Sequence, residues 1–145
     1  MIPLVLALVA SAPDEAWAEF SRADPYSQVN EMVAVRSLPG RAEYQLTYTR
    51  QSGRKTETFT TTSAVCPYAR PVIGSMRGLS MPSVAPFGVD GDRRGSVQDG
   101  ALYKLRGPTD SSDGEITVSS NTGTPLAVWV DKALGALELC WRRAR

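Results

Sequence analysis

The chain contains no histidine, and this absence excludes several kinds of active site at once. Ser-His-Asp and Cys-His catalysis within the chain both need an imidazole, as does any metal site with histidine ligands. A histidine pH switch near neutrality is excluded for the same reason. With only two cysteines among the 145 residues, a zinc or copper site would have to rely on carboxylates. The sequence therefore predicts no metal, no cofactor and no catalytic residues.

The chain also lacks an excess of charge of either sign. Its 16 basic and 15 acidic residues leave a formal net charge of +1, so no overall electrostatic attraction to nucleic acid is expected. Lysine is scarce, since Lys55, Lys104 and Lys132 are the only lysines, and arginine supplies the other basic side chains. No apolar stretch reaches the roughly 20 residues that cross a bilayer as a helix, so no membrane span is expected in the mature chain.

The apolar run at residues 2–10 is typical of the hydrophobic region of a secretory signal peptide. Cleavage after Ala12 or, as the alternative, after Ala18 satisfies the preference for small residues. We therefore predict a signal peptide over 1–12, or to residue 18, and a single domain over 13–145. The competing interpretation is a mature protein whose first helix begins at residue 2. Export predicts a periplasmic or secreted protein, in a compartment where a pair of cysteines is most simply a disulfide.

Helical spacing marks the first part of the predicted domain. Trp17 and Phe20 lie three residues apart in a segment with early acidic residues, which predicts a short N-terminal helix over 14–22. Val29, Met32 and Val33 fit a second helical face.

Two later segments show the alternation of a half-buried strand. Residues 44–49 alternate apolar and polar, and the threonine-rich residues 55–62 follow a glycine turn, which predicts a β-hairpin. A second hairpin is predicted over 103–119. Between them, 66–100 is an irregular segment rich in proline and glycine, with room for one or two helical turns near 72–76.

The C-terminal helix has the clearest signals. Thr124 is a good N-cap, and Pro125 is favoured at the first helical position. Gly135 is costly inside a helix, which suggests that something approaches the backbone closely there. Apolar side chains recur at steps of three and four residues: Leu126, Trp129, Val130, Ala133, Leu137, Cys140 and Trp141. The predicted fold class is α+β: a small single domain with one antiparallel sheet from two β-hairpins, the C-terminal helix packed on it and a short N-terminal helix.

The two cysteines predict a structural disulfide. Cys66 follows the first hairpin and Cys140 lies in the last turn of the predicted helix, each beside apolar residues. A redox pair is the alternative, but the chain has no C-x-x-C motif.

Three other motifs fail on inspection. The segment 90–95 begins like a calcium loop but has Arg94 at the fifth position, where a ligand is needed. Residues 52–55 match S-x-x-K, yet they lie on a predicted turn and the accompanying motifs are absent. The acidic group Asp110, Asp113 and Glu115 has the composition of an ordinary turn.

A basic group at the first hairpin is the remaining candidate for binding. It comprises Arg41, Arg50, Arg54 and Lys55, and it suits an anionic ligand or another envelope protein, with a solvated surface as the alternative. The partner is otherwise unknown. The sequence favours an exported, non-catalytic binding or interaction module of the bacterial envelope. The alternatives are a small envelope enzyme that uses carboxylate or Ser/Lys chemistry, and a subunit of a larger envelope assembly.

Overall fold

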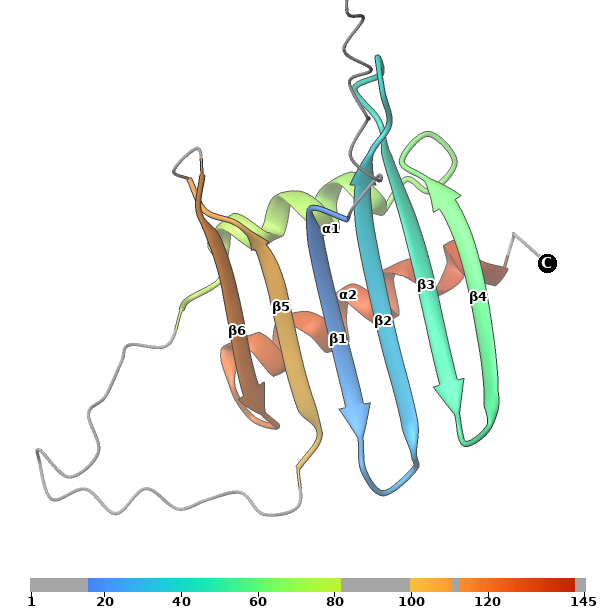
Figure 1. The fold of residues 1–145 in the computed structure, drawn as a ribbon, viewed down its shortest axis with the longest axis vertical. Coiled ribbons are helices and arrows are strands. Elements are labelled where there is room, and N and C mark those ends of the chain that lie inside the picture. The colour runs from blue at the N-terminus through green and yellow to red at the C-terminus, as the bar shows by residue number, and fades with distance from the viewer. Residues whose placement is uncertain (1–15, 82–99, 111–112, 143–145) are drawn as a thin grey trace, which may run out of the picture.

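The computed structural model describes residues 16–81, 100–110 and 113–142, which form one antiparallel sheet and two helices (Figure 1). The strands follow the order β4-β3-β2-β1-β5-β6 across the sheet. The elements in chain order are β1 (Ala18–Asp24), β2 (Val29–Ser37), β3 (Tyr44–Ser52), β4 (Lys55–Thr62), α1 (Ala69–Ser75), the 3-10 turn η1 (Met76–Gly78), β5 (Leu102–Pro108), β6 (Glu115–Asn121) and α2 (Pro125–Arg142).

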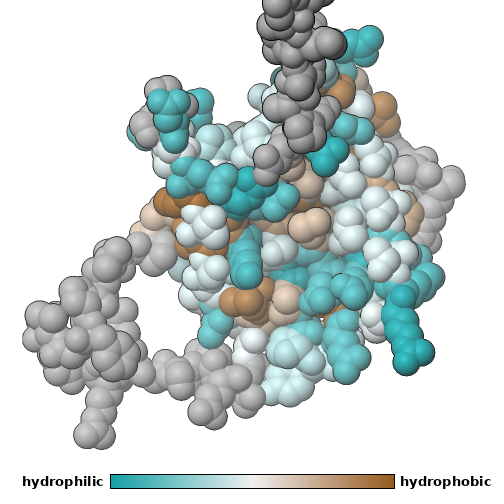
Figure 2. Space-filling view, viewed as in Figure 1, coloured by the Kyte–Doolittle hydropathy of each residue, from teal (hydrophilic) through white to brown (hydrophobic). Residues whose placement is uncertain are grey.

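The molecule has two layers, because both helices lie on the same face of the sheet (Figure 1). The core lies between the layers and is formed by Phe20, Val33, Val35, Leu46, Leu105, Val130 and Leu137. The other face alternates with these residues and is rich in threonine, including Thr47, Thr49, Thr58 and Thr60. Figure 2 looks onto this second face, which is mainly white and teal with few brown patches. The antiparallel α+β class predicted from the sequence is therefore confirmed.

The predicted N-terminal helix over 14–22 is wrong. Its described part contains the start of β1, where Ala18 and Phe20 are buried while Glu19 and Ser21, which alternate with them, are less so. The strand lies between β2 and β5 and is paired on both sides. Two hydrogen-bonded neighbours outweigh a weak local helical pattern, since propensity yields to tertiary context.

The second helical face, at Val29, Met32 and Val33, is wrong for the same reason. These residues belong to β2, in which Val33 is fully buried whereas Met32 is 38% exposed on the opposite face. The two predicted hairpins are confirmed as β3–β4 and β5–β6. They share one sheet as expected, but β2 and β1 lie between them.

The C-terminal helix is confirmed as α2. The Thr124 hydroxyl accepts a hydrogen bond from the Ala127 backbone N–H at 3.2 Å, which is the N-cap interaction expected before Pro125. The predicted apolar stripe faces the sheet, with Trp129 at its margin and only partly buried. The Trp129 ring meets Phe20 edge-on with ring centroids 5.1 Å apart, and its Nε1 donates to the Ser75 hydroxyl at 2.8 Å.

The disulfide between Cys66 and Cys140 is also confirmed, with the two Cα atoms 5.5 Å apart. Both cysteines are buried. The bridge joins the segment after β4 to the last turn of α2, two parts of the chain 74 residues apart. It therefore holds the C-terminal end of the helix near the β4 side of the sheet.

Several predictions fall outside the described residues. The signal peptide over 1–12 is one, and the segment 90–95 with its calcium-like sequence is another. Of the irregular region 66–100, the structure describes 66–81 and Gly100, and the helical turns expected near 72–76 are present as α1 and η1. In the described ranges, no helix is long and apolar enough to cross a membrane.

Candidate functional site

A row of charged side chains crosses the helix-covered face near one end of the sheet. In the strand register Arg22 lies opposite Glu31, Glu31 opposite Arg50, and Arg50 opposite Glu57. The signs therefore alternate across four neighbouring strands. The next row on the same face contains Phe20 and its apolar neighbours, so the charges lie directly beside the core.

Arg22 is the centre of an ion-pair network between the sheet and α2. Its guanidinium donates to Glu31 of β2 and, at 2.9 Å, to Asp131 of α2. Two tyrosines donate to the same carboxylates: Tyr48 to Glu31 at 2.6 Å and Tyr103 to Asp131 at 3.1 Å. Each carboxylate is thus engaged by a guanidinium and a phenol, which fixes the side chains at this end of the interface.

The network shifts the pKa of each of its donors. Burial lowers the pKa of Arg22, but the hydrogen bonds and charges of Glu31 and Asp131 outweigh this effect and hold it above its ordinary value. Burial, followed by the hydrogen bond to Glu31, raises the pKa of Tyr48 well above the usual tyrosine range. The same two causes, with Asp131 as the partner, raise the pKa of Tyr103.

Tyr48 is expected to make the protein sensitive to alkaline pH. Because its pKa is raised in the folded state, the folded protein favours the neutral phenol, and this contribution is complete below the ordinary pKa of 10.0. It is lost as the pH rises above that value. Urea denaturation from about pH 9 to about pH 11 should therefore show a steeper fall in the free energy of unfolding for the wild type than for Tyr48→Phe. Tyr68→Phe, at an exposed tyrosine, is the control and should follow the wild type. Equal slopes for the wild type and Tyr48→Phe would contradict the assignment.

Beside this network lies an open hollow of about 200 Å³ between α2 and the sheet. The sheet contributes Arg22, Glu31 and Tyr48. The helix contributes five residues that lie three, four or seven positions apart and therefore share one side of α2, at the edge of its apolar stripe: Asp131, Leu134, Gly135, Glu138 and Trp141. These residues come from β1, β2, β3 and α2, so only the folded sheet with its helix forms the hollow.

Gly135 widens the hollow. A Cβ atom built there meets nothing within 4 Å in the described structure outside its own stretch of helix, so no other segment of the described structure packs against the bare backbone. The close approach suggested by the sequence is not present, and the glycine leaves open space instead.

Gly135→Ala is therefore expected to stabilise the protein. The new methyl group meets no described atom, and alanine is better than glycine inside a helix by about 0.5–1 kcal/mol. Thermal or urea denaturation would measure the gain. A loss of stability would mean that another part of the chain occupies the space beside Gly135.

The aromatic end of the hollow is formed by Tyr48 and Trp141. Their rings are stacked, with centroids 5.3 Å apart and planes inclined by 11°. Trp141 is only 6% exposed, and among the described residues its Nε1 has no hydrogen-bond partner. An indole N–H next to the hollow therefore provides a spectroscopic reporter for this site.

No family model, curated protein or solved structure matches this chain. The chemistry of the hollow must therefore be inferred from its own residues. In the part of the chain that the structure describes, no group of three or more Cys, Asp or Glu side chains is placed to hold a metal ion.

The structure divides the basic group predicted from the sequence. Arg50, Arg54 and Lys55 lie around the β3–β4 turn, whereas Arg41 precedes β3 at the opposite end of that strand. The nine residues of β3 separate these ends by about 30 Å. Lys55 pairs with Glu57 at 3.0 Å, and Arg50 lies opposite Glu31 and Glu57 in the sheet. Lys55 and Arg50 thus have carboxylates beside them. A role of the basic group in binding anions stays a prediction.

The other two motifs also have simple positions. Ser52 and Lys55 are paired at the β3–β4 turn, away from the hollow. In the acidic group, Glu115 forms an ion pair with Arg106 at 2.8 Å, at the start of β6.

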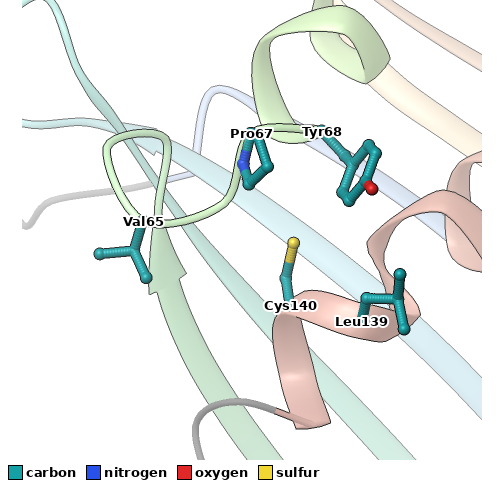
Figure 3. A pocket seen from close by; sticks show the side chains of 5 residues that line it. All are labelled: Val65, Pro67, Tyr68, Leu139 and Cys140. Atoms are coloured by element: carbon teal, nitrogen blue, oxygen red, sulfur yellow. The ribbon is translucent and has the colours of Figure 1, made fainter.

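A second, smaller feature is an apolar notch of about 10 Å³ beside the disulfide (Figure 3). Figure 3 shows Val65 and Pro67 from the segment after β4 around Cys140 at the end of α2. Three of the apolar side chains at the notch are exposed: Val65 by 66%, Leu139 by 52% and Tyr68 by 44%. The notch is too small for an organic ligand, and its exposed rim is an apolar surface patch.

Proposed function

We propose that this chain is a non-catalytic binding module of the bacterial envelope that takes its ligand in the hollow between α2 and the sheet. The observation that carries the proposal is the hollow itself: about 200 Å³ of open space beside a fixed ion-pair network. Small-ligand sites are concave, and a few convergent polar groups set within a mainly apolar lining fix the orientation of the ligand. This hollow combines charged groups with Leu134 and the Trp141 ring.

The hydrogen bonds of the network favour binding over catalysis. A general acid or base must exchange a proton with its substrate during the reaction. Glu31 and Asp131 each accept hydrogen bonds from Arg22 and a tyrosine, so a guanidinium and a phenol fix the orientation of each carboxylate. Such a network suits a preformed surface that a ligand meets without rearrangement.

The disulfide supports a site of action outside the cytosol, because such bridges persist in oxidising compartments. Cleavage after Ala12 fits the fold better than cleavage after Ala18, since Ala18 is fully buried and begins β1. Fractionation and N-terminal sequencing of the mature protein test this part of the proposal. Recovery from the cytosol with Met1 attached would contradict it.

Fragment screening by NMR tests the binding site. We expect some members of a library of small cationic, anionic and neutral fragments to shift the Trp141 indole N–H signal and the Gly135 amide signal. Trp141→Phe assigns the indole signal among those of the three tryptophans. Gly135→Leu, which fills the hollow, should abolish the shifts. Gly74→Ala is the matched control, because Gly74 is a helical glycine of α1 that does not line the hollow. If no fragment of any charge perturbs these signals, the binding proposal fails.

A small enzyme that uses carboxylates is the second candidate. It is favoured by the convergence of Glu31, Asp131 and Glu138 on one hollow. Glycosidases, for example, use two carboxylates on either side of the reacting bond. Turnover of a glycoside or ester substrate that is lost in Glu138→Gln, with no loss of stability, would favour the enzyme over the binding module.

Membership of a larger envelope assembly is a third candidate, favoured by the exposed apolar rim of the notch beside the disulfide. Its test is the state of the purified full chain in solution. A complex or oligomer that Leu139→Glu dissociates without loss of stability would favour the assembly.

A further inference from the structure

We propose that the hollow selects a small organic cation that carries a primary ammonium group. This inference rests on the binding function proposed above and names its ligand class. Three carboxylates and one guanidinium line the hollow, so its lining has a net negative charge: Glu31, Asp131 and Glu138 against Arg22. Arg50, which lies opposite Glu31 in the sheet and is exposed, does not line the hollow.

The hydrogen-bonding capacity of the network matches an ammonium group. Among the residues that the structure describes, each oxygen of Glu31 and Asp131 accepts one hydrogen bond from Arg22 or a tyrosine. A carboxylate oxygen has two lone pairs, so each can accept a second donor, and an ammonium group provides three. An anion that approached the guanidinium of Arg22 would also approach Glu31 and Asp131, the two carboxylates that flank it, and would be repelled by them. The charge of the lining and its acceptors therefore both favour a cation.

The volume of the hollow suits a small cation. It is about 200 Å³, which is below the range for drug-sized ligands. Leu134 and the Trp141 ring offer apolar contact to a short alkyl chain, while the bare backbone at Gly135 leaves room for it. A four-carbon alkylammonium has a suitable size and polarity.

Butylammonium, butyrate and butanol form a matched set of probes with the same carbon chain and different charge. Titrations of the full-length protein at pH 7, followed by the Trp141 indole signal, should give a dissociation constant for butylammonium at least ten-fold lower than for butanol. Butyrate should not bind. Because Asp131 is 45% exposed, salt should screen the attraction, and binding should weaken between low and high ionic strength.

Three variants locate the binding and separate it from folding. Glu138→Gln should weaken butylammonium binding several-fold while leaving butanol binding unchanged. Gly135→Ala adds a methyl group that narrows the hollow. Because the same substitution should stabilise α2, any weaker binding of butylammonium cannot be ascribed to unfolding. Gly74→Ala should bind as the wild type does.

Each outcome decides a different claim. If butyrate or butanol binds as tightly as butylammonium, and Gly135→Leu abolishes the binding, the ammonium proposal is overturned while the hollow remains a binding site. If butylammonium binds equally well to Gly135→Leu, the site lies elsewhere and the ammonium proposal fails for the hollow. If none of the three probes shifts the Trp141 signal, the ammonium proposal is overturned, and the wider fragment screen then decides the binding function.

Discussion

Replacing both Cys66 and Cys140 with alanine is expected to lower the free energy of unfolding by about 2–5 kcal/mol. The bridge closes a loop of 74 residues, for which the chain-entropy model gives a stabilisation of about 4 kcal/mol. It also anchors the end of α2, whose packing covers one face of the sheet. Denaturation of the oxidised wild type and the double variant would measure the difference.

The double variant avoids an unpaired thiol in a buried position, since both cysteines are buried. Mass measurement of the unreduced wild-type protein is the control, because it shows whether the bridge is present in the sample. Two free thiols, or a covalent dimer, would contradict the intramolecular disulfide. Equal stability of the two proteins would show that packing alone holds the end of α2.

Phe20→Ala is the single substitution with the largest expected effect, a loss of about 3–5 kcal/mol. Phe20 is 1% exposed on β1, near the middle of the sheet, with Val33 and Leu105 opposite it on the two neighbouring strands. Its ring also meets Trp129 of α2. Removing the ring leaves a cavity between the layers that these neighbours can fill only by moving.

Urea denaturation would measure this loss. Ser21→Ala is the matched control, because Ser21 is the next residue of the same strand and points to the opposite face. Its effect should stay within about 0.5 kcal/mol. A similar stability for Phe20→Ala and Ser21→Ala would show that the core is not centred on β1.

The elements that the sequence predicts correctly are those with strong local signals. Tyr44, Leu46 and Tyr48 alternate with polar residues along β3, and Thr124 with Pro125 marks the start of α2. The cysteines were correctly paired because there were only two of them. In each case the local pattern agrees with the tertiary environment.

β1 and β2 were missed because their alternation is interrupted where the hollow lies. The core-facing positions of β1 run Ala18, Phe20, Arg22, and the corresponding positions of β2 include Glu31 and Val33. Arg22 and Glu31 face the helix layer as an ion pair. A charged residue at an inward position removes the hydrophobic period on which strand prediction depends.

The residues that form the candidate site therefore also prevented its prediction from the sequence. Its parts come from three strands and a helix more than 75 residues further along the chain, and no local motif joins them. The one local signal was Gly135, an unfavourable residue inside an otherwise regular helix. The sequence did not show whether that glycine admits a neighbouring segment or leaves space.

The position of β1 between β2 and β5 also determines the order in which the sheet can assemble. β1 to β4 are neighbours along the chain and can pair through short turns, but Glu19 of β1 meets Arg106 of β5, which lies 87 positions further along the chain. Such distant pairing is slow because the loop must close before any contact forms. Until β5 arrives, β1 is an open edge that can pair with another chain. Folding is therefore expected to compete with self-association at high concentration.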